Sequence, residues 1–171
     1  MGLEVKMLDD LKFIHEKDSD DALGIAAKQY EQLEVSYDLP ELSFPVENIV
    51  FAGMGGSALA ALLSLTWPGY NLPFEIWRRY DAPNYVSDKT LFIASSYSGN
   101  TEETLSALAQ AEEQGAHIVV IASGGKLEAI AQEKGYPFAK LPKASQPRFG
   151  ALYSLKALVT ILERAGFVSE E

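Results

Sequence analysis

Residues 48–65, NIVFAGMGGSALAALLSL, contain in order a short apolar run, a glycine-rich turn and a helical stretch. The run Ile49–Ala52 is continuously apolar, which is typical of a strand buried on both faces. Further apolar runs follow at Phe74–Trp77, Leu91–Ala94, Ile118–Ala122 and Phe138–Leu141. Helical stretches separate most of these runs, so the pattern predicts βαβ units. We expect an α/β fold, a doubly wound three-layer αβα sandwich around a five-stranded parallel sheet.

The expected helices lie on both sides of this pattern. Three of them separate strands, at Ala58–Leu65, Thr101–Gln114 and Lys126–Lys134, and Phe149–Ala165 closes the domain. The connection from the second apolar run to the third is too short for a full helix. Before the first strand, apolar residues recur at helical spacing from residue 3 to residue 35. We expect residues 1–44 to form a helical leader that packs on a domain of residues 45–171.

The leader is predicted to contain a break at Lys17–Asp20, where Ser19 or Asp20 caps the second helix. A proline-containing linker, Leu39–Pro45, then leads into the domain.

Composition limits the classes of partner. The 171 residues carry a formal net charge of −10, which argues against nucleic acid and against anionic membrane surfaces. No apolar run is long enough to span a bilayer, and no signal peptide is visible. The chain has no cysteine, which excludes disulfides and thiolate metal sites and fits the cytoplasm. No spacing of histidines and carboxylates suggests a metal site.

The first candidate binding loop is Gly53–Ser57, between the first strand and its helix. Glycines let the backbone approach a ligand, and a helix N-terminus presents N–H groups to an anion. This composition is also that of an ordinary turn. Gly53, Gly55 and Ala58 satisfy the dinucleotide fingerprint G-x-G-x-x-A, with Asp81 downstream as a candidate ribose ligand. At this point both alternatives stay open.

The second loop, Ser95–Thr101 (SSYSGNT), carries four Ser and Thr hydroxyls within seven residues. It follows the third strand and opens a helix, with Asn100 expected as the N-cap. Hydroxyls and helix-end N–H groups both donate hydrogen bonds to phosphate oxygens. A dinucleotide fold does not require such a cluster, so the loop favours a small phosphorylated ligand.

Arg148 stands at the entry to the last helix, where the helix dipole disfavours a cation. It is therefore a candidate for contact with an anion or a developing oxyanion, although a surface ion pair would also explain it. His15 and His117 are expected to be structural. Glu102 and Glu103 are expected to complement the dipole of the helix that follows the second loop.

Three motifs together resemble the sugar isomerase (SIS) domain, which has a flavodoxin-like fold. They are Gly53–Ala58 (GMGGSA), Ser96–Thr104 (SYSGNTEET) and Gln146–Arg148 (QPR). They are most similar to the bifunctional phosphoglucose/phosphomannose isomerases. The resemblance implies substrate phosphate contacts from a set of small residues: Gly55, Gly56, Ser57, Ser96, Ser98, Gly99 and Thr101.

The resemblance also implies the reaction. Arg148 would stabilise the enediolate formed while a proton moves between C1 and C2, without metal or organic cofactor. The ligands would be fructose 6-phosphate, glucose 6-phosphate and mannose 6-phosphate. The family's glutamate base, histidine and lysine come from a second SIS domain and have no matching position in this sequence. We therefore expect a homodimer or pairing with a second SIS domain, and little turnover by this chain alone. A regulatory phosphosugar sensor is the alternative.

Overall fold

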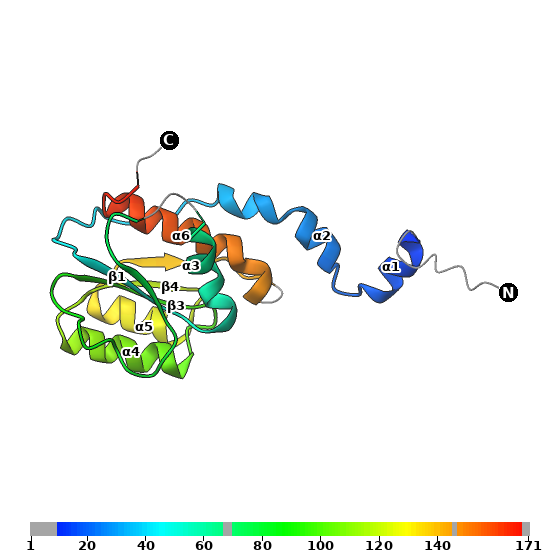
Figure 1. Cartoon of the computed structure of the whole chain (residues 1–171). Coiled ribbons are helices and arrows are strands. Elements are labelled where there is room, and N and C mark those ends of the chain that lie inside the picture. The colour runs from blue at the N-terminus through cyan, green and yellow to red at the C-terminus, as the bar shows by residue number, and fades with distance from the viewer. Residues whose placement is uncertain (1–9, 67–69, 145–146, 169–171) are drawn as a thin grey trace.

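Five parallel strands form one sheet in the order β2-β1-β3-β4-β5 (Figure 1). The computed structural model describes residues 10–66, 70–144 and 147–168. The strands are β1 (Asn48–Ala52), β2 (Phe74–Trp77), β3 (Thr90–Ser96), β4 (His117–Ala122) and β5 (Phe138–Lys140). All five predicted strands are confirmed. The strand order reverses between β1 and β3, as in flavodoxin-like folds.

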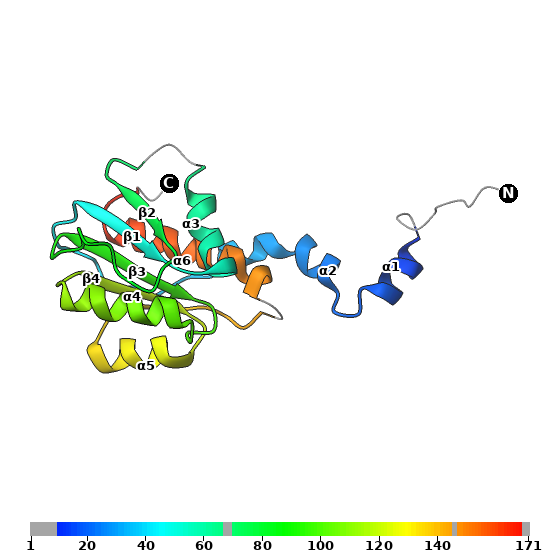
Figure 2. The same cartoon turned by 60° about the horizontal axis from the view of Figure 1, so that its bottom comes forward.

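Helices cover both faces of the sheet, as predicted. Ile49 and Phe51 face α3 (Leu59–Ser64) and α6 (Ala151–Arg164). Val50 and Ala52 face the other side, where α4 (Glu102–Glu113) and α5 (Gly125–Lys134) lie (Figure 2). Each fully buried large apolar side chain contributes about 1.5–3 kcal/mol to folding. The two layers therefore hold the sheet, and its loops, in place.

The connection from β2 to β3 is the one that was expected to lack a helix, and this is confirmed. Residues 78–89 are all described and contain no helical segment. Ala82 and Val86 from this connection are buried beside β1 and β3 on the α4 face. A loop thus takes the place of the missing crossover helix.

Two predicted helices begin later than expected, because a short 3₁₀ turn precedes each. The turn η2 (Gly55–Ala58) precedes α3, and η3 (Pro147–Gly150) precedes α6. The two turns contact each other. The end of the first glycine loop and the segment of Arg148 are therefore neighbours in space.

The leader divides into a projecting part and a packed part. Helices α1 (Leu11–Lys17) and α2 (Ala22–Ala27) bury no side chain and extend away from the sandwich (Figures 1 and 2). Contacts with the sandwich begin at η1 (Gln29–Glu34), which lies against α6. Tyr37, Leu39 and Leu42 then join the core. The domain boundary at residue 44 stays a prediction.

The predicted cap of the second leader helix is wrong. Asp18, rather than Ser19 or Asp20, accepts hydrogen bonds from the start of α2, at 2.7 Å from Ala22 N and 2.9 Å from Leu23 N. These two bonds lower the pKa of the Asp18 carboxyl. Among the described helices, none combines the length and apolar character that a membrane crossing requires.

Candidate functional site

The candidate site lies at the carboxyl edge of the sheet, where the strand order reverses. The loops after β1 and β3 meet there around a cavity of about 210 Å³. Its lining residues come from these two loops: Met54, Gly56, Ser57, Ser96, Tyr97, Ser98 and Thr101. The sequence predicted five of the seven as ligand contacts. Such a position at the switch point is where open parallel sheets bind ligands.

The hydroxyls of Ser57 and Ser98 each accept one hydrogen bond from the backbone. Ser57 Oγ accepts from Tyr97 N at 3.0 Å, which joins the loop after β1 to the loop after β3. Ser98 Oγ accepts from Asn100 N at 3.3 Å. Because each oxygen already accepts, its own O–H remains available to donate to a ligand in the cavity.

The other two hydroxyls form a pair. Ser96 Oγ and Thr101 Oγ1 are 2.7 Å apart, and Gly99 N donates to Ser96 Oγ at 3.1 Å. Ser96 is buried, with 1% of its surface exposed, and Thr101 is half-buried. One hydroxyl of the pair donates to the other, so the second can donate to a ligand. Ser98 Oγ is also 3.5 Å from Ser96 Oγ, so together with Ser57 the cavity can offer two or three O–H donors to an anion.

The N-terminus of α4 adds to this donor set. Thr101 is the N-cap and makes no capping hydrogen bond with its side chain. The helix end carries a partial positive charge that attracts anions. The prediction that Asn100 is the N-cap is wrong. Its side chain instead accepts from Lys126 N at 3.1 Å and donates to Ser98 O at 3.0 Å.

The loop after β4 packs against the loop after β3. Gly99 has φ +68°, and a Cβ placed there would lie 1.8 Å from Gly124 O. Gly99 O accepts from Leu127 N at 3.0 Å, at the start of α5. The first amides of α5 are thus occupied by Asn100 and Gly99. This supporting role of Gly124 and its neighbours was not predicted, because the loop lacks the hydroxyl cluster that marks the ligand loops.

Arg148 lies beside the site rather than in the wall of the cavity. It is exposed, and its guanidinium is 5.7 Å from the centre of the Phe149 ring. Its segment, η3, contacts η2 of the first loop. Two other predicted contacts, Gly55 and Gly99, also do not line the cavity. Met54 and Tyr97 line it and were missed by the sequence.

The two histidines and the two glutamates that follow the second loop do not line the cavity. The ring of His117 stacks on Phe44, with centroids 3.7 Å apart, and His15 is exposed in α1. Glu102 and Glu103 lie in the first turn of α4. The negative charge of Glu103, and to a smaller extent that of Glu102, raises the pKa of Tyr80. The described residues hold no cluster of three His, Asp or Glu side chains suited to a metal ion.

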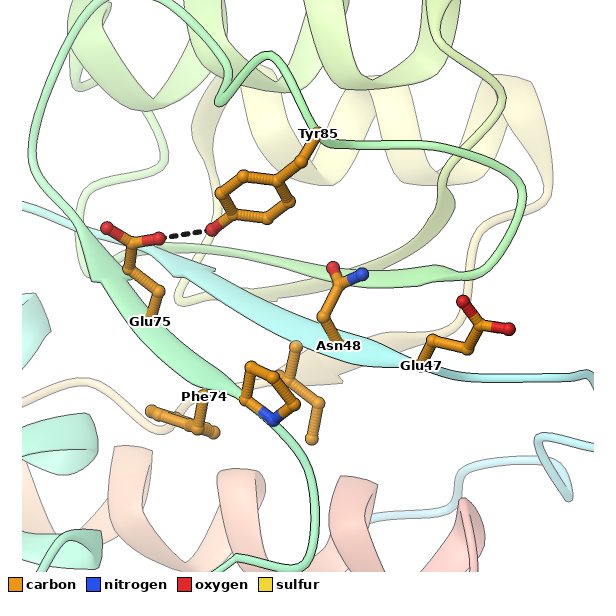
Figure 3. A pocket seen from close by; sticks show the side chains of 7 residues that line it. Glu47, Asn48, Phe74, Glu75 and Tyr85 are labelled. Carbon is orange, nitrogen blue, oxygen red and sulfur yellow. Dashed lines mark hydrogen bonds between the residues drawn. The ribbon is translucent and has the colours of Figure 1, made fainter.

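A larger cavity, of about 610 Å³, lies at the opposite edge of the sheet, where β1 and β2 begin (Figure 3). Tyr85 donates a hydrogen bond to Glu75 across this cavity. Burial of the Tyr85 hydroxyl raises its pKa, and the hydrogen bond to Glu75 raises it further. Glu47 also lines it, and the remaining walls are mostly apolar. Two carboxylates repel a phosphate group, so the smaller cavity suits a phosphorylated ligand better despite its size.

Curated proteins of known function are similar to this chain in sequence. The chain is 36% identical over 146 residues to the bifunctional phosphoglucose/phosphomannose isomerase of Caldicellulosiruptor bescii, covering 81% of this chain and 43% of that protein. It is 39% identical over 141 residues to the D-glucosamine-6-phosphate 4-epimerase of Sulfolobus acidocaldarius, covering 81% and 44%. The chain therefore spans less than half the length of these curated relatives.

Solved structures share the fold. The NanR protein of Vibrio vulnificus, complexed with ManNAc-6P, matches with a TM-score of 0.53 and 18% identity over 93% of this chain and 65% of that one. The SIS domain profile matches residues 75–163, from β2 to the end of α6 and through the hydroxyl loop. Since this match covers more than half of the sequence, the chain belongs to the SIS domain family.

Proposed function

We propose that the chain binds the phosphate group of a sugar 6-phosphate in the 210 Å³ cavity. The observation that carries this proposal is the convergence of hydroxyl donors from two loops on the N-terminus of α4. A phosphate group has three terminal oxygens that accept hydrogen bonds strongly. The cavity can offer two or three O–H donors and the positive end of a helix, which suit these negatively charged acceptor oxygens.

We further propose that the chain is the N-terminal part of an aldose–ketose isomerase acting on glucose 6-phosphate and mannose 6-phosphate, with fructose 6-phosphate as the ketose. Arg148 would stabilise the enediolate during proton transfer between C1 and C2. The catalytic base would come from a second domain. Support comes from the curated relative in C. bescii and from the position of η3 beside the first loop. The regulatory sensor alternative is not favoured, because curated relatives carry the names of enzymes.

The relative in S. acidocaldarius supports a second candidate function, epimerisation at C4 of an amino sugar phosphate. The two functions share the phosphate contacts and differ in the sugar. A comparison of the affinities for fructose 6-phosphate and glucosamine 6-phosphate separates them. Tighter binding of the amino sugar by more than tenfold would favour the epimerase.

The phosphate contacts are tested by calorimetric titration of the chain with fructose 6-phosphate and with inorganic phosphate. We expect Ser57→Ala and Ser98→Ala each to weaken both affinities by about 10- to 100-fold, because hydrogen bonds to charged groups contribute about 1.5–3 kcal/mol. Ser43→Ala, at an exposed serine of the linker, is the matched control. Unchanged binding by both cavity variants would refute the proposal.

We also propose that the chain pairs with a second SIS domain, in a homodimer or with a separate domain. The outer face of α3 supports this pairing. Leu59, Leu62, Leu63 and Leu65 are 36–49% exposed, whereas Ala60, Ala61 and Ser64 form the buried face. An exposed helix with leucines outside and small residues inside is typical of an interface. The cytoplasmic location stays a prediction.

A further inference from the structure

Tyr97 contacts the segments that follow β1, β4 and β5 at the carboxyl edge of the sheet. Its backbone N donates to Ser57 Oγ in the loop after β1, at 3.0 Å. Its carbonyl accepts from Ser123 N at 3.0 Å and from Ser123 Oγ at 2.6 Å, in the loop after β4. Its side chain reaches the segment after β5. One residue of the phosphate loop is therefore in contact with three other loops.

The Tyr97 side chain contacts both sides of the segment that carries Arg148. Its hydroxyl lies 3.2 Å from Pro142 O and 3.4 Å from Ala144 O, and it accepts a hydrogen bond from Ala144 N. Its ring faces Gly150, where an added Cβ would lie 3.2 Å from Tyr97 Cε2. Arg148 lies between these two contacts in the sequence. The Tyr97 side chain thus contacts this segment on both sides of Arg148 and ties it to the loop after β3, while Gln32 Nε2 donates to Phe149 O at 2.6 Å from the leader.

This arrangement matters because a sugar phosphate would have to be bound both at its phosphate group and at its reacting carbons. The phosphate would lie in the cavity, and the reacting carbons would lie at some distance from it. A misplacement of about 1 Å between a binding group and a reacting group can cost about 100-fold in rate. A fixed connection between the phosphate loop and the Arg148 segment keeps this distance constant.

We propose that Tyr97 is a positioning residue that holds Arg148 at the sugar end of the site. The inference rests on the proposed function, in which Arg148 faces the enediolate. A purely structural role for Tyr97 would be carried by its ring, which packs against the core. The positioning role is carried by the hydroxyl. Tyr97→Phe separates the two, since it keeps the ring and every backbone contact and removes the hydroxyl contacts to Pro142 and Ala144.

The test uses two probes that bind the chain without turnover. Inorganic phosphate reports on the cavity alone. The second probe is 5-phospho-arabinonate, a sugar-acid phosphate whose carboxylate stands for the enediolate oxygens. We expect Arg148→Ala to weaken the affinity for 5-phospho-arabinonate about 10- to 100-fold, because a charge-assisted pair between guanidinium and carboxylate is lost. We expect Tyr97→Phe to weaken it about fivefold, because it removes neutral hydrogen bonds.

The double variant decides whether Tyr97 acts through Arg148. Tyr97→Phe should have no further effect once Arg148 is alanine, because coupled residues give non-additive effects. Phosphate affinity should stay within about twofold of wild type in all variants. Tyr37→Phe is the matched control, since Tyr37 also donates to a backbone carbonyl, that of Tyr153, but away from the cavity. It should leave both affinities unchanged.

Each other outcome overturns a defined statement. If Arg148→Ala weakens the sugar acid but Tyr97→Phe does not, or if their effects add, Tyr97 is not a positioning residue and the proposed function survives. If Tyr97→Phe weakens inorganic phosphate as well, Tyr97 acts on the phosphate loop instead. If Arg148→Ala has no effect, the role proposed for Arg148 is itself wrong, and the inference falls with it.

A second variant covers the case in which Tyr97→Phe does not fold. Gly150→Ala places a methyl group against the Tyr97 ring, 3.2 Å from Cε2, and so disturbs the same contact from the Arg148 segment. The backbone φ of −98° at this position is one that alanine adopts freely. We expect it to weaken 5-phospho-arabinonate and to spare inorganic phosphate. Equal affinity for the sugar acid in Gly150→Ala and wild type would contradict the inference.

Discussion

At the scale of single residues, the loop after β3 requires glycine at position 99. The backbone there has φ +68°, which L side chains rarely adopt, and no room exists for a Cβ because Gly124 O would be 1.8 Å away. Both constraints arise from the close approach of the loops after β3 and β4. A glycine is therefore required for the geometry of the cavity, even though Gly99 does not line it.

Gly99→Ala tests this requirement against Gly135→Ala. Gly135 has a similar φ of +72° but an open surrounding with no atom within 4 Å of an added Cβ. We expect Gly135→Ala to cost about 1–2 kcal/mol of unfolding free energy from backbone strain alone. Gly99→Ala should cost about 2–5 kcal/mol, because overpacking adds to the strain. Urea denaturation measures both. Equal losses would mean that the contact with Gly124 is unimportant.

At the scale of elements, α2 depends on a cap outside its own first turn. Asp18 accepts hydrogen bonds from Leu23 N and Ala22 N, and these bonds lower the pKa of its carboxyl below the ordinary value of 3.8. A carboxyl with a lowered pKa in the folded state contributes stability at higher pH. That contribution is lost as the pH falls through the lowered pKa.

We therefore expect the secondary chemical shifts that report helix at Ala22–Ala27 to decrease as the pH is lowered, with a midpoint below pH 3.8. Asp18→Asn should reduce the helical secondary chemical shifts at neutral pH, because its amide oxygen accepts weaker hydrogen bonds than a charged carboxylate does, and the amide does not titrate. Asp20→Asn is the control and should behave like wild type. The account fails if Asp18→Asn leaves the α2 shifts unchanged at neutral pH.

Elements dictated by periodicity were predictable from the sequence, and those fixed by long-range contacts were not. The continuous apolar runs predicted every strand, because a strand covered on both faces needs apolar residues at each position. The helix caps predicted at Asn100 and at Ser19 or Asp20 were wrong, because a capping side chain can accept from N–H groups outside the expected turn and a neighbouring Asp can replace it. The side chain of Asn100 accepts a hydrogen bond from Lys126 N, 26 residues away in the sequence, and so does not cap α4.

The candidate site was predictable to the same extent. Loop composition indicated Ser96, Ser98 and Thr101, because a cluster of hydroxyls at a helix start suits a phosphate, and the resemblance to the SIS domain added Ser57. Tyr97 gave no such signal. Its partners lie between 26 and 47 residues away, so that nothing in the neighbouring sequence marks its contacts.

At the scale of the whole molecule, helix α3 and the segments next to it in the sequence carry no charge, although the protein as a whole is acidic. The chain carries a net charge of −10, yet residues 48–74 contain no charged residue at all. Two copies with the same negative charge repel each other over most of their surfaces. Helix α3 itself adds no charge to such a repulsion, and its exposed leucines gain free energy when removed from water.

Replacing Leu62 and Leu63 together by glutamate tests whether this face joins two copies. Sedimentation equilibrium should show wild type as a dimer at micromolar concentration and the double variant as a monomer, because four buried carboxylates without partners cannot be accommodated in a symmetric contact. Both side chains are about 40% exposed in the single chain, so its thermal stability should change little. Ala109→Glu, at an exposed position of α4, controls for the added charge. A monomeric wild type would exclude the homodimer and leave pairing with a separate SIS domain.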